Sequence, residues 1–248
     1  MQRWGIRVAV ALACLVVVAG SLYKLAKSRT TQLLGRLVVR VETSKPVVAL
    51  TFDDGPTPIA VDEIIKSLGA RNVRATFFVT GSELARNPEA GHRLVAAGHE
   101  LGNHTFSHDR MVLKSYAFIR SEIERTDALI RAAGHVGPIH FRAPFCKKLL
   151  WLPWFLWRTD RTSVTWDVEP DSYGDVSKNA ERITAHVLER ARPGSIILLH
   201  VWYPSNAPAR AAIPGIVDGL RARGFRLVTV NELLALAPPA SRKHLPTW

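Results

Sequence analysis

The chain has 248 residues, which is long enough for one large domain or two small ones with a sizeable core. Its composition is that of a globular protein and excludes a largely disordered chain, and the presence of only two cysteines, Cys14 and Cys146, excludes a disulfide framework. The formal net charge of +12 favours anionic surroundings, but the basic residues are scattered and match no nucleic-acid-binding motif, so no nucleic-acid partner is expected.

The N-terminal segment carries the signal for membrane targeting. Sixteen uncharged residues from Val8 to Tyr23 lie between basic residues on both sides. This run is slightly short for a spanning helix and slightly long for the core of a signal peptide. We expect residues 1–23 to anchor the chain in the cytoplasmic membrane, with the domain facing the periplasm or exterior and residues 24–36 as a tether. A cleaved signal peptide followed by secretion is the alternative, and a buried helix of a soluble protein is the third interpretation.

From residue 37 onward, β-prone runs alternate with helical patterns and no repeats occur. After a leading strand at 37–43, strands are predicted at 47–52, 75–80, 99–103, 139–143, 163–168, 194–199 and 225–230. Helices are predicted at 58–68, 87–97, 115–133, 178–191 and 208–223. The alternation predicts an α/β fold with parallel strands, and polar residues at several strand ends favour a barrel over an open sheet. The domain is expected to cover residues 37–238, with a tail at 239–248.

Residues 149–158 read LLWLPWFLWR and lie between basic residues. One interpretation is a helix that packs against the barrel. The other is an aromatic, basic lip that rests at a membrane interface or stacks on sugar. The sequence leaves both interpretations open.

Two acids and two histidines stand at the ends of predicted strands. Asp53 and Asp54 follow an apolar strand and precede a Gly-Pro turn, so they lie where barrel enzymes keep their chemistry. His104 and His108 close a later strand, and their spacing would place both imidazoles on one face of a helical turn. Two nitrogens and one carboxylate oxygen form a catalytic zinc set with an open position, at which a bound water has a pKa near 7.

Four more polar residues fall at later strand ends, namely Arg142, Asp167, Asp171 and His200. Each has an ordinary explanation as a surface arginine, a helix-capping acid or a core histidine. Their common placement at one end of the sheet predicts a site.

At these residues the chain resembles the polysaccharide deacetylases of the NodB-homology group, carbohydrate esterase family 4. The resemblance runs from about Arg40 to Leu234 and rests on TFDDGP (51–56), HTFSH (104–108), RAPF (142–145) and LLH (198–200). It implies a distorted (β/α)7-type barrel, preceded here by one hydrophobic helix. It also implies one divalent metal ion, with zinc favoured.

The resemblance assigns a role to each motif. Asp54, His104 and His108 would bind the metal, while Asp53 would stay free of it and act as the general base beside Arg142. The oxyanion would be held by the metal and by the backbone N–H of Phe145, and His200 would protonate the departing amine. Leu198 would line the pocket for the acetyl methyl, and Trp166 joins Phe145 and Leu198 in the substrate-binding set.

The sequence departs from the family pattern at several positions. Ala143 replaces a frequent proline, Phe145 a frequent tyrosine, and Cys146 a common glycine. The acid that orients the histidine in the family falls on Ser172, counted from Trp166. Asp171 and Asp167 are therefore both candidates for that role.

The expected function is hydrolysis of the N-acetyl amide of amino sugars in a cell-envelope polysaccharide, either a chitooligosaccharide or a peptidoglycan-like glycan. The alternative is removal of an acetyl or formyl group from a lipid-linked amino sugar at the membrane face. A non-catalytic glycan-binding module is the competing hypothesis from another class. The sequence leaves the glycan, the native metal and the oligomeric state open.

Overall fold

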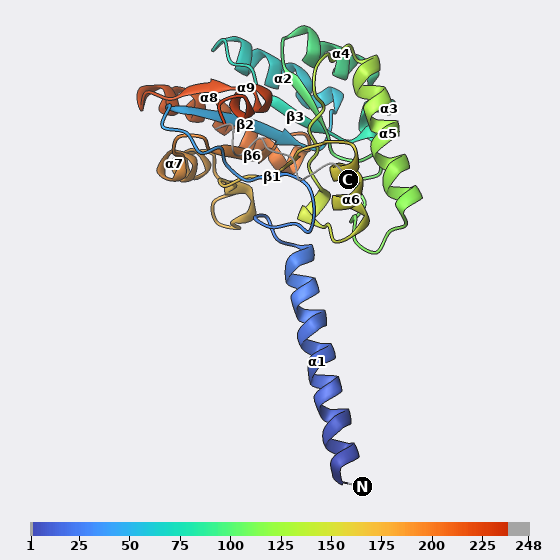
Figure 1. The fold of residues 1–248 in the computed structure, drawn as a ribbon. Coiled ribbons are helices and arrows are strands. Elements are labelled where there is room, and N and C mark those ends of the chain that lie inside the picture. The colour runs from blue at the N-terminus through green and yellow to red at the C-terminus, as the bar shows by residue number, and fades with distance from the viewer. Residues whose placement is uncertain (1, 238–248) are drawn as a thin grey trace.

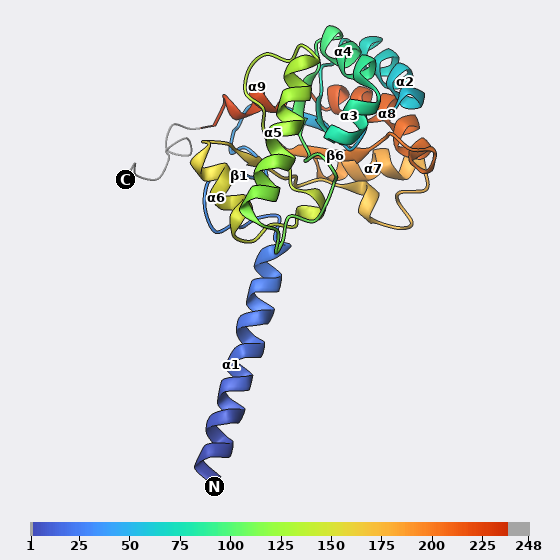
Figure 2. The same cartoon turned by 90° about the vertical axis from the view of Figure 1, so that its right-hand side faces the viewer.

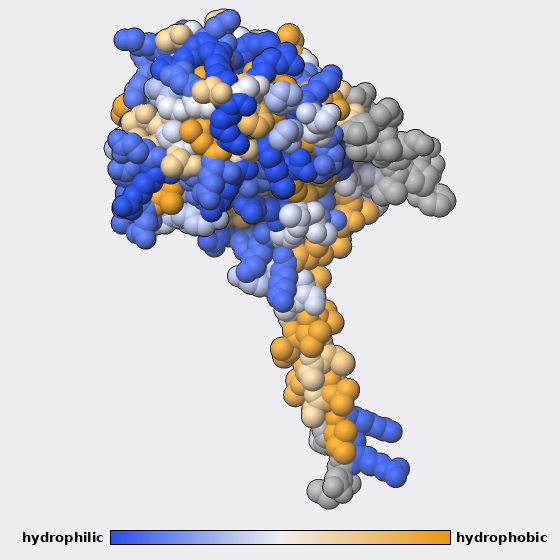
Figure 3. Space-filling model, turned by 90° about the vertical axis from the view of Figure 1, so that its left-hand side faces the viewer, coloured by the Kyte–Doolittle hydropathy of each residue, from blue (hydrophilic) through white to orange (hydrophobic). Residues whose placement is uncertain are grey.

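The long N-terminal helix stands apart from the rest of the molecule. The computed structural model describes residues 2–237, so the predicted tail at 239–248 lies outside the described residues. Helix α1 (Gln2–Ala26) projects from a compact body as a single rod (Figures 1 and 2). By length and composition its segment Ile6–Ala26 could cross a membrane, and it appears as an apolar stalk beneath a mainly hydrophilic body in Figure 3.

The body is built on parallel strands, as predicted. The strands are β1 (Leu37–Val38), β2 (Val47–Asp53), β3 (Thr76–Val79), β4 (Glu100–Asn103), β5 (Ser163–Val164), β6 (Ile196–His200) and β7 (Arg226–Val228). Five of them form a sheet in the order β4-β3-β2-β6, with β7 also paired to β2, and β1 pairs with β5. All these pairs are parallel, which confirms the predicted α/β class.

Isolated bridges continue the sheet into a distorted barrel. Phe141 bridges to Asn103 on one side and to Ser163 on the other, and Val168 bridges to Ile197. The predicted strand at 139–143 is therefore reduced to one bridging residue. Pro138 and Pro144 flank it, and a proline has no N–H to donate to a strand ladder. The predicted strand at 163–168 is regular only at its first two residues.

Five predicted helices are present with small shifts at their ends: α2 (Pro58–Gly69), α4 (Pro88–Ala96), α5 (Tyr116–Ala132), α7 (Ala180–Arg190) and α8 (Ala207–Ala222). Two short helices were not predicted, α3 (Gly81–Arg86) and α9 (Val230–Leu234). Three 3₁₀ turns also occur, each beginning at a proline: η1 (Pro144–Cys146), η2 (Pro170–Ser172) and η3 (Pro204–Asn206).

The Trp-rich segment forms helix α6 (Trp151–Arg158). Its residues Leu152 and Phe155 are buried against α5, as the packing interpretation predicts. On its opposite face Trp151 and Trp154 are 44% and 39% exposed. The helix therefore packs on the body and also presents an aromatic face.

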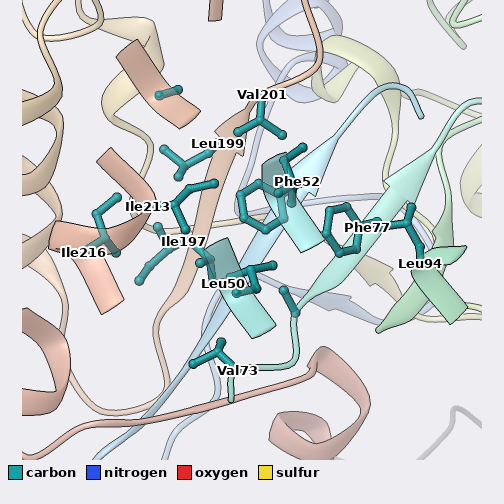
Figure 4. Close-up of a cluster of buried hydrophobic side chains, with 14 of the residues drawn as sticks. Leu50, Phe52, Val73, Phe77, Leu94, Ile197, Leu199, Val201, Ile213 and Ile216 are labelled. Atoms are coloured by element: carbon teal, nitrogen blue, oxygen red, sulfur yellow. The ribbon is translucent and has the colours of Figure 1, made fainter. Parts of the chain in front are cut away.

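Strand β2 has two buried faces, and this burial sets the direction of the Asp53 side chain. Leu50 and Phe52 face the large cluster between the sheet and helices α2 and α8, part of which is drawn in Figure 4. Val47 and Ala49 alternate with them and belong to a second cluster inside the barrel. Because side chains alternate along a strand, Asp53 continues the inner row and points into the barrel.

The turn after β2 depends on Gly55. This residue has φ +56°, and an added Cβ would lie 2.3 Å from the ring of Trp202. Gly55→Ala is expected to lower the free energy of unfolding by about 2–4 kcal/mol, because it combines backbone strain with overpacking. Urea denaturation of the full chain in detergent measures this change.

Gly137→Ala is the matched control, since Gly137 has φ +99° with no atom within 4 Å of an added Cβ. It should cost only about 1 kcal/mol, from backbone strain alone. Equal losses in the two variants would contradict a close contact with Trp202.

Candidate active site

The innermost pair of the site is Asp53 with Arg142. The Arg142 guanidinium is fully buried, and its Nη1 donates to Asp53 Oδ1 at 2.6 Å and to Thr51 Oγ1 at 2.9 Å. Its other nitrogens donate to the carbonyls of Val164 and Thr165, both at 3.1 Å. Since four acceptors fix the guanidinium, one oxygen of Asp53 is held and the other is directed into the barrel.

Asp54 points differently because its backbone is left-handed. Its φ is 72°, a region that few residues other than glycine adopt, so its side chain leaves the strand alternation. Its Oδ1 lies 3.2 Å from His108 Nε2 and 3.7 Å from His104 Nε2. This oxygen is buried and accepts no hydrogen bond within the part of the chain that the structure describes.

The two histidines converge through an irregular loop, and the prediction of a helical turn is wrong. Residues 104–108 form no helix, and Thr105 and His108 both have positive φ, at 67° and 61°. The two rings nevertheless lie 4.9 Å apart, centroid to centroid. The two imidazoles therefore lie close together, as expected. The left-handed backbone at Thr105 and His108 brings them together, and no helical turn is involved.

The donor set fits a divalent cation. The ligand atoms of Asp54, His104 and His108 lie within 4.8 Å of one another. Burial lowers the pKa of His104 despite the nearby carboxylates, which keeps the imidazole neutral as a metal ligand must be. His104 Nδ1 lies 2.8 Å from the Arg142 carbonyl, which can only accept, so the lone pair is on Nε2, toward Asp54. With the unpartnered Asp54 oxygen, these features match a cation site with two nitrogen ligands and one oxygen ligand.

A buried acid that sequence reasoning missed supports the histidine loop. Glu122 of α5 is buried, and its Oε2 accepts from the backbone N–H groups of Phe106 and Ser107 at 3.0 and 2.7 Å and from the Ser107 hydroxyl at 2.9 Å. The available signal was a glutamate on the face of the predicted helix that also carries Ile119 and Ile123. Such an acid needs buried donors, and the loop supplies three.

On the other side of the site, His200 is held by Asp171. Asp171 Oδ2 lies 3.2 Å from His200 Nδ1 and also accepts from the His200 backbone N–H. Burial disfavours the imidazolium, but the hydrogen bond to Asp171 and the charges of Asp53, Asp54 and Asp171 outweigh burial and raise the pKa of His200 to about 9.

The structure separates the two acids that the sequence left as alternatives. Asp167 does not contact His200. Its carboxylate accepts from the Ser195 hydroxyl and the Ile196 N–H, both at 2.9 Å, and thereby holds the start of β6. Asp171 reaches His200 because η2 begins at Pro170 and turns the chain toward the end of β6.

One cavity of about 520 Å³ is lined by Asp53, Asp54, His104, His108 and His200. The three residues predicted to bind substrate, Phe145, Leu198 and Trp166, all line it. Leu198 is buried in its wall, whereas Phe145 is 54% exposed at φ 54°, with its ring 4.7 Å from the His108 ring. Cys146 also lines the cavity, and burial raises the pKa of its thiol to about 11, so it stays protonated at neutral pH.

Residues 40–149 match the sequence profile described as polysaccharide deacetylase. The chain is also 33% identical over 201 residues to a chitooligosaccharide deacetylase of Bradyrhizobium sp. (strain ANU 289), an alignment that covers 75% of this chain and 90% of that protein. This chain belongs to the polysaccharide deacetylase family. The resemblance suggested by the motifs is thereby confirmed.

Two further members of the polysaccharide deacetylase family illustrate its range. The peptidoglycan-N-acetylmuramic acid deacetylase PdaC of Bacillus subtilis (strain 168) is 33% identical over 194 residues, and the match covers 78% of this chain but only 40% of PdaC. A crystal structure of a peptidoglycan N-acetylglucosamine deacetylase superposes with a TM-score of 0.75 at 29% identity, covering 79% of this chain and 92% of that one. Because these relatives are named for different N-acetylated glycans, membership of the family leaves the glycan open.

The cation site makes a direct prediction. Asp54→Ala removes one of three ligands, and loss of a supporting partner alone costs 10–100-fold in metal affinity, so Zn²⁺ affinity should fall by more than about 100-fold. Isothermal titration calorimetry on the full chain in detergent measures the affinity. Asp109→Ala is the control. Asp109 follows His108 in the chain but pairs with Lys114, so its replacement should leave Zn²⁺ affinity unchanged. Tight Zn²⁺ binding by the Asp54→Ala protein would contradict the assignment.

Proposed function

We propose that the chain hydrolyses the N-acetyl amide of an amino sugar in a cell-envelope glycan, releasing acetate and a free amine. The observation that carries this proposal is that Asp53 and His200 stand opposite each other in the register of the neighbouring strands β2 and β6. They lie beside the cluster of Asp54, His104 and His108. An acid fixed by an arginine therefore faces a histidine whose pKa is raised to about 9. Groups with opposite proton preferences on either side of one cavity suit general acid–base catalysis.

The proposed roles follow from these positions. Asp53, oriented by Arg142, takes a proton from the attacking water. His200, protonated at neutral pH, gives a proton to the departing nitrogen. Asp171 acts as its positioning residue, since it holds Nδ1 and leaves Nε2 to face the cavity. Phe145 supplies a backbone N–H toward the oxyanion, and Leu198 accommodates the acetyl methyl.

We propose Zn²⁺ as the resident ion, held by Asp54, His104 and His108. Two imidazole nitrogens and one carboxylate oxygen form a ligand set typical of catalytic zinc with an open position. When bound, the ion supplies Lewis acidity to the acyl oxygen and to a water molecule.

We also propose that α1 anchors the enzyme in the cytoplasmic membrane with the catalytic body on the outer side. The segment Ile6–Ala26 has a mean hydropathy of 2.2, and its residues 6–24 are exposed outside the body. The relatives named for peptidoglycan are consistent with an enzyme that meets its substrate outside the cytoplasm.

Asp53→Asn tests the catalytic role of the acid. This change keeps the size of the side chain but removes the base, so kcat should fall by about 10²–10⁴-fold while Zn²⁺ affinity stays within twofold. Acetate release from chitopentaose and calorimetric Zn²⁺ binding measure the two quantities. Unchanged turnover would contradict the role of Asp53 as base, and loss of Zn²⁺ binding would instead make Asp53 a ligand. If the unsubstituted chain releases no acetate, a non-catalytic glycan-binding module is favoured.

Asp171→Asn tests whether Asp171 positions His200, the proposed general acid. His200 must be protonated to act, so activity falls as pH rises through its pKa. Because Asp171 raises that pKa, its replacement should move the alkaline limb of kcat/KM to lower pH by about one unit.

The matched control for this shift is Asp167→Asn. Its carboxylate contacts Ser195 and Ile196, so the alkaline limb should stay in place. A shift in the Asp167 variant without one in the Asp171 variant would reverse the assignment of the positioning acid.

A further inference from the structure

Three cations on the rim of the catalytic cavity are unused by the proposed chemistry. Lys27, Arg29 and Lys147 line the same cavity as Asp53, His104 and His200, and we call these three the basic rim. Arg29 lies 3.7 Å from Glu169 and is 45% exposed. Within residues 2–237, Lys27 and Lys147 pair with no carboxylate. Their ammonium groups instead lie 4.6 and 5.1 Å from the centre of the Tyr23 ring.

The basic rim is fixed in place, because the first residues of the predicted tether at 24–36 are bonded to the body. Helix α1 continues to Ala26, whose carbonyl accepts from the Lys148 backbone N–H at 2.9 Å. The buried Lys148 ammonium donates to the Ser28 carbonyl, and the Thr165 hydroxyl donates to the Arg29 carbonyl at 2.8 Å. The segment that leaves α1 is therefore bonded to the chain neighbours of Lys147 and Trp166, which line the catalytic cavity.

This attachment places the cavity close to the end of the apolar helix. Arg29 is three residues beyond Ala26, a separation of at most about 11 Å even for a fully extended chain. Helix α6, with its exposed Trp151 and Trp154, lies on the same lower side of the body, next to the end of α1, in both Figure 1 and Figure 2. Exposed tryptophans and lysines around the end of an apolar helix are typical of the headgroup level of a bilayer.

We propose that the basic rim binds the phosphate of a lipid-linked N-acyl amino sugar and so delivers the acyl group to Asp53 and His200. This inference rests on the proposed function and names its substrate class. In such a substrate the lipid, the phosphate and the sugar follow one another. In the protein, the apolar helix, the basic rim and the catalytic residues follow in the same order. Lysine and arginine form charge-assisted hydrogen bonds with phosphate oxygens, whereas an uncharged glycan offers no group that needs three cations.

The test compares two substrates on the full chain in a neutral detergent, which holds no phospholipid. One is a short polyprenyl-diphosphate-linked N-acetylglucosamine, and the other is chitopentaose, which carries no phosphate. The first should show a kcat/KM at least about tenfold higher. Combined replacement of the basic rim, Lys27→Gln with Arg29→Gln and Lys147→Gln, should abolish this preference by raising KM for the phosphate-linked substrate.

The charge-matched control replaces three exposed lysines away from the cavity, Lys45→Gln with Lys66→Gln and Lys178→Gln, and should keep the preference. Sedimentation with vesicles containing anionic phospholipid separates the sources of phosphate. If replacement of the basic rim weakens vesicle binding but not the substrate preference, the cations bind headgroups and the inference is overturned.

Failure of this inference differs from failure of the proposed function. Acetate release from chitopentaose without any preference for the phosphate-linked sugar overturns the inference alone. No acetate release from either substrate by the Zn²⁺-loaded chain overturns both.

Discussion

The site depends on the buried guanidinium of Arg142. The guanidinium donates to Asp53 and Thr51 on β2 and to the carbonyls of Val164 and Thr165. The backbone carbonyl of Arg142 accepts from His104. One residue therefore orients the proposed base, fixes the tautomer of a proposed metal ligand and joins strands across the barrel. A buried charge is tolerated only when it is fully paired, and removal of one partner from such a pair typically costs about 3–5 kcal/mol. The same contacts therefore support stability and the proposed catalysis.

The sequence predicted the framework well because its signals are local. The apolar run before Asp53, the alternation of strands with helices and the positions of polar residues at strand ends all follow from short-range patterns. These patterns grouped the two acids with His104 and His108, and the family resemblance named Asp54 as the ligand that lies with both histidines in the structure. The different directions of Asp53 and Asp54 were not visible in the patterns, because they depend on the positive φ of Asp54.

Other features depend on contacts between distant segments, which a single sequence does not record. The support of the histidine loop by Glu122 joins residues fifteen or sixteen apart. The choice between Asp167 and Asp171 required the path of η2 toward the end of β6. The bonding of residues 26–29 to Lys148 and Thr165 spans more than a hundred residues.

If α1 lies in a bilayer, as proposed, that last attachment limits how far from the membrane the enzyme can act. A flexible tether over residues 24–36 would have an r.m.s. end-to-end distance of about 20 Å, and the body could move that far from its anchor. With the linker bonded down and α1 in a bilayer, the cavity instead keeps a constant height above the lipid. Each molecule would then encounter substrate by lateral diffusion in two dimensions. The cavity would not reach polymer strands that lie farther out in the envelope.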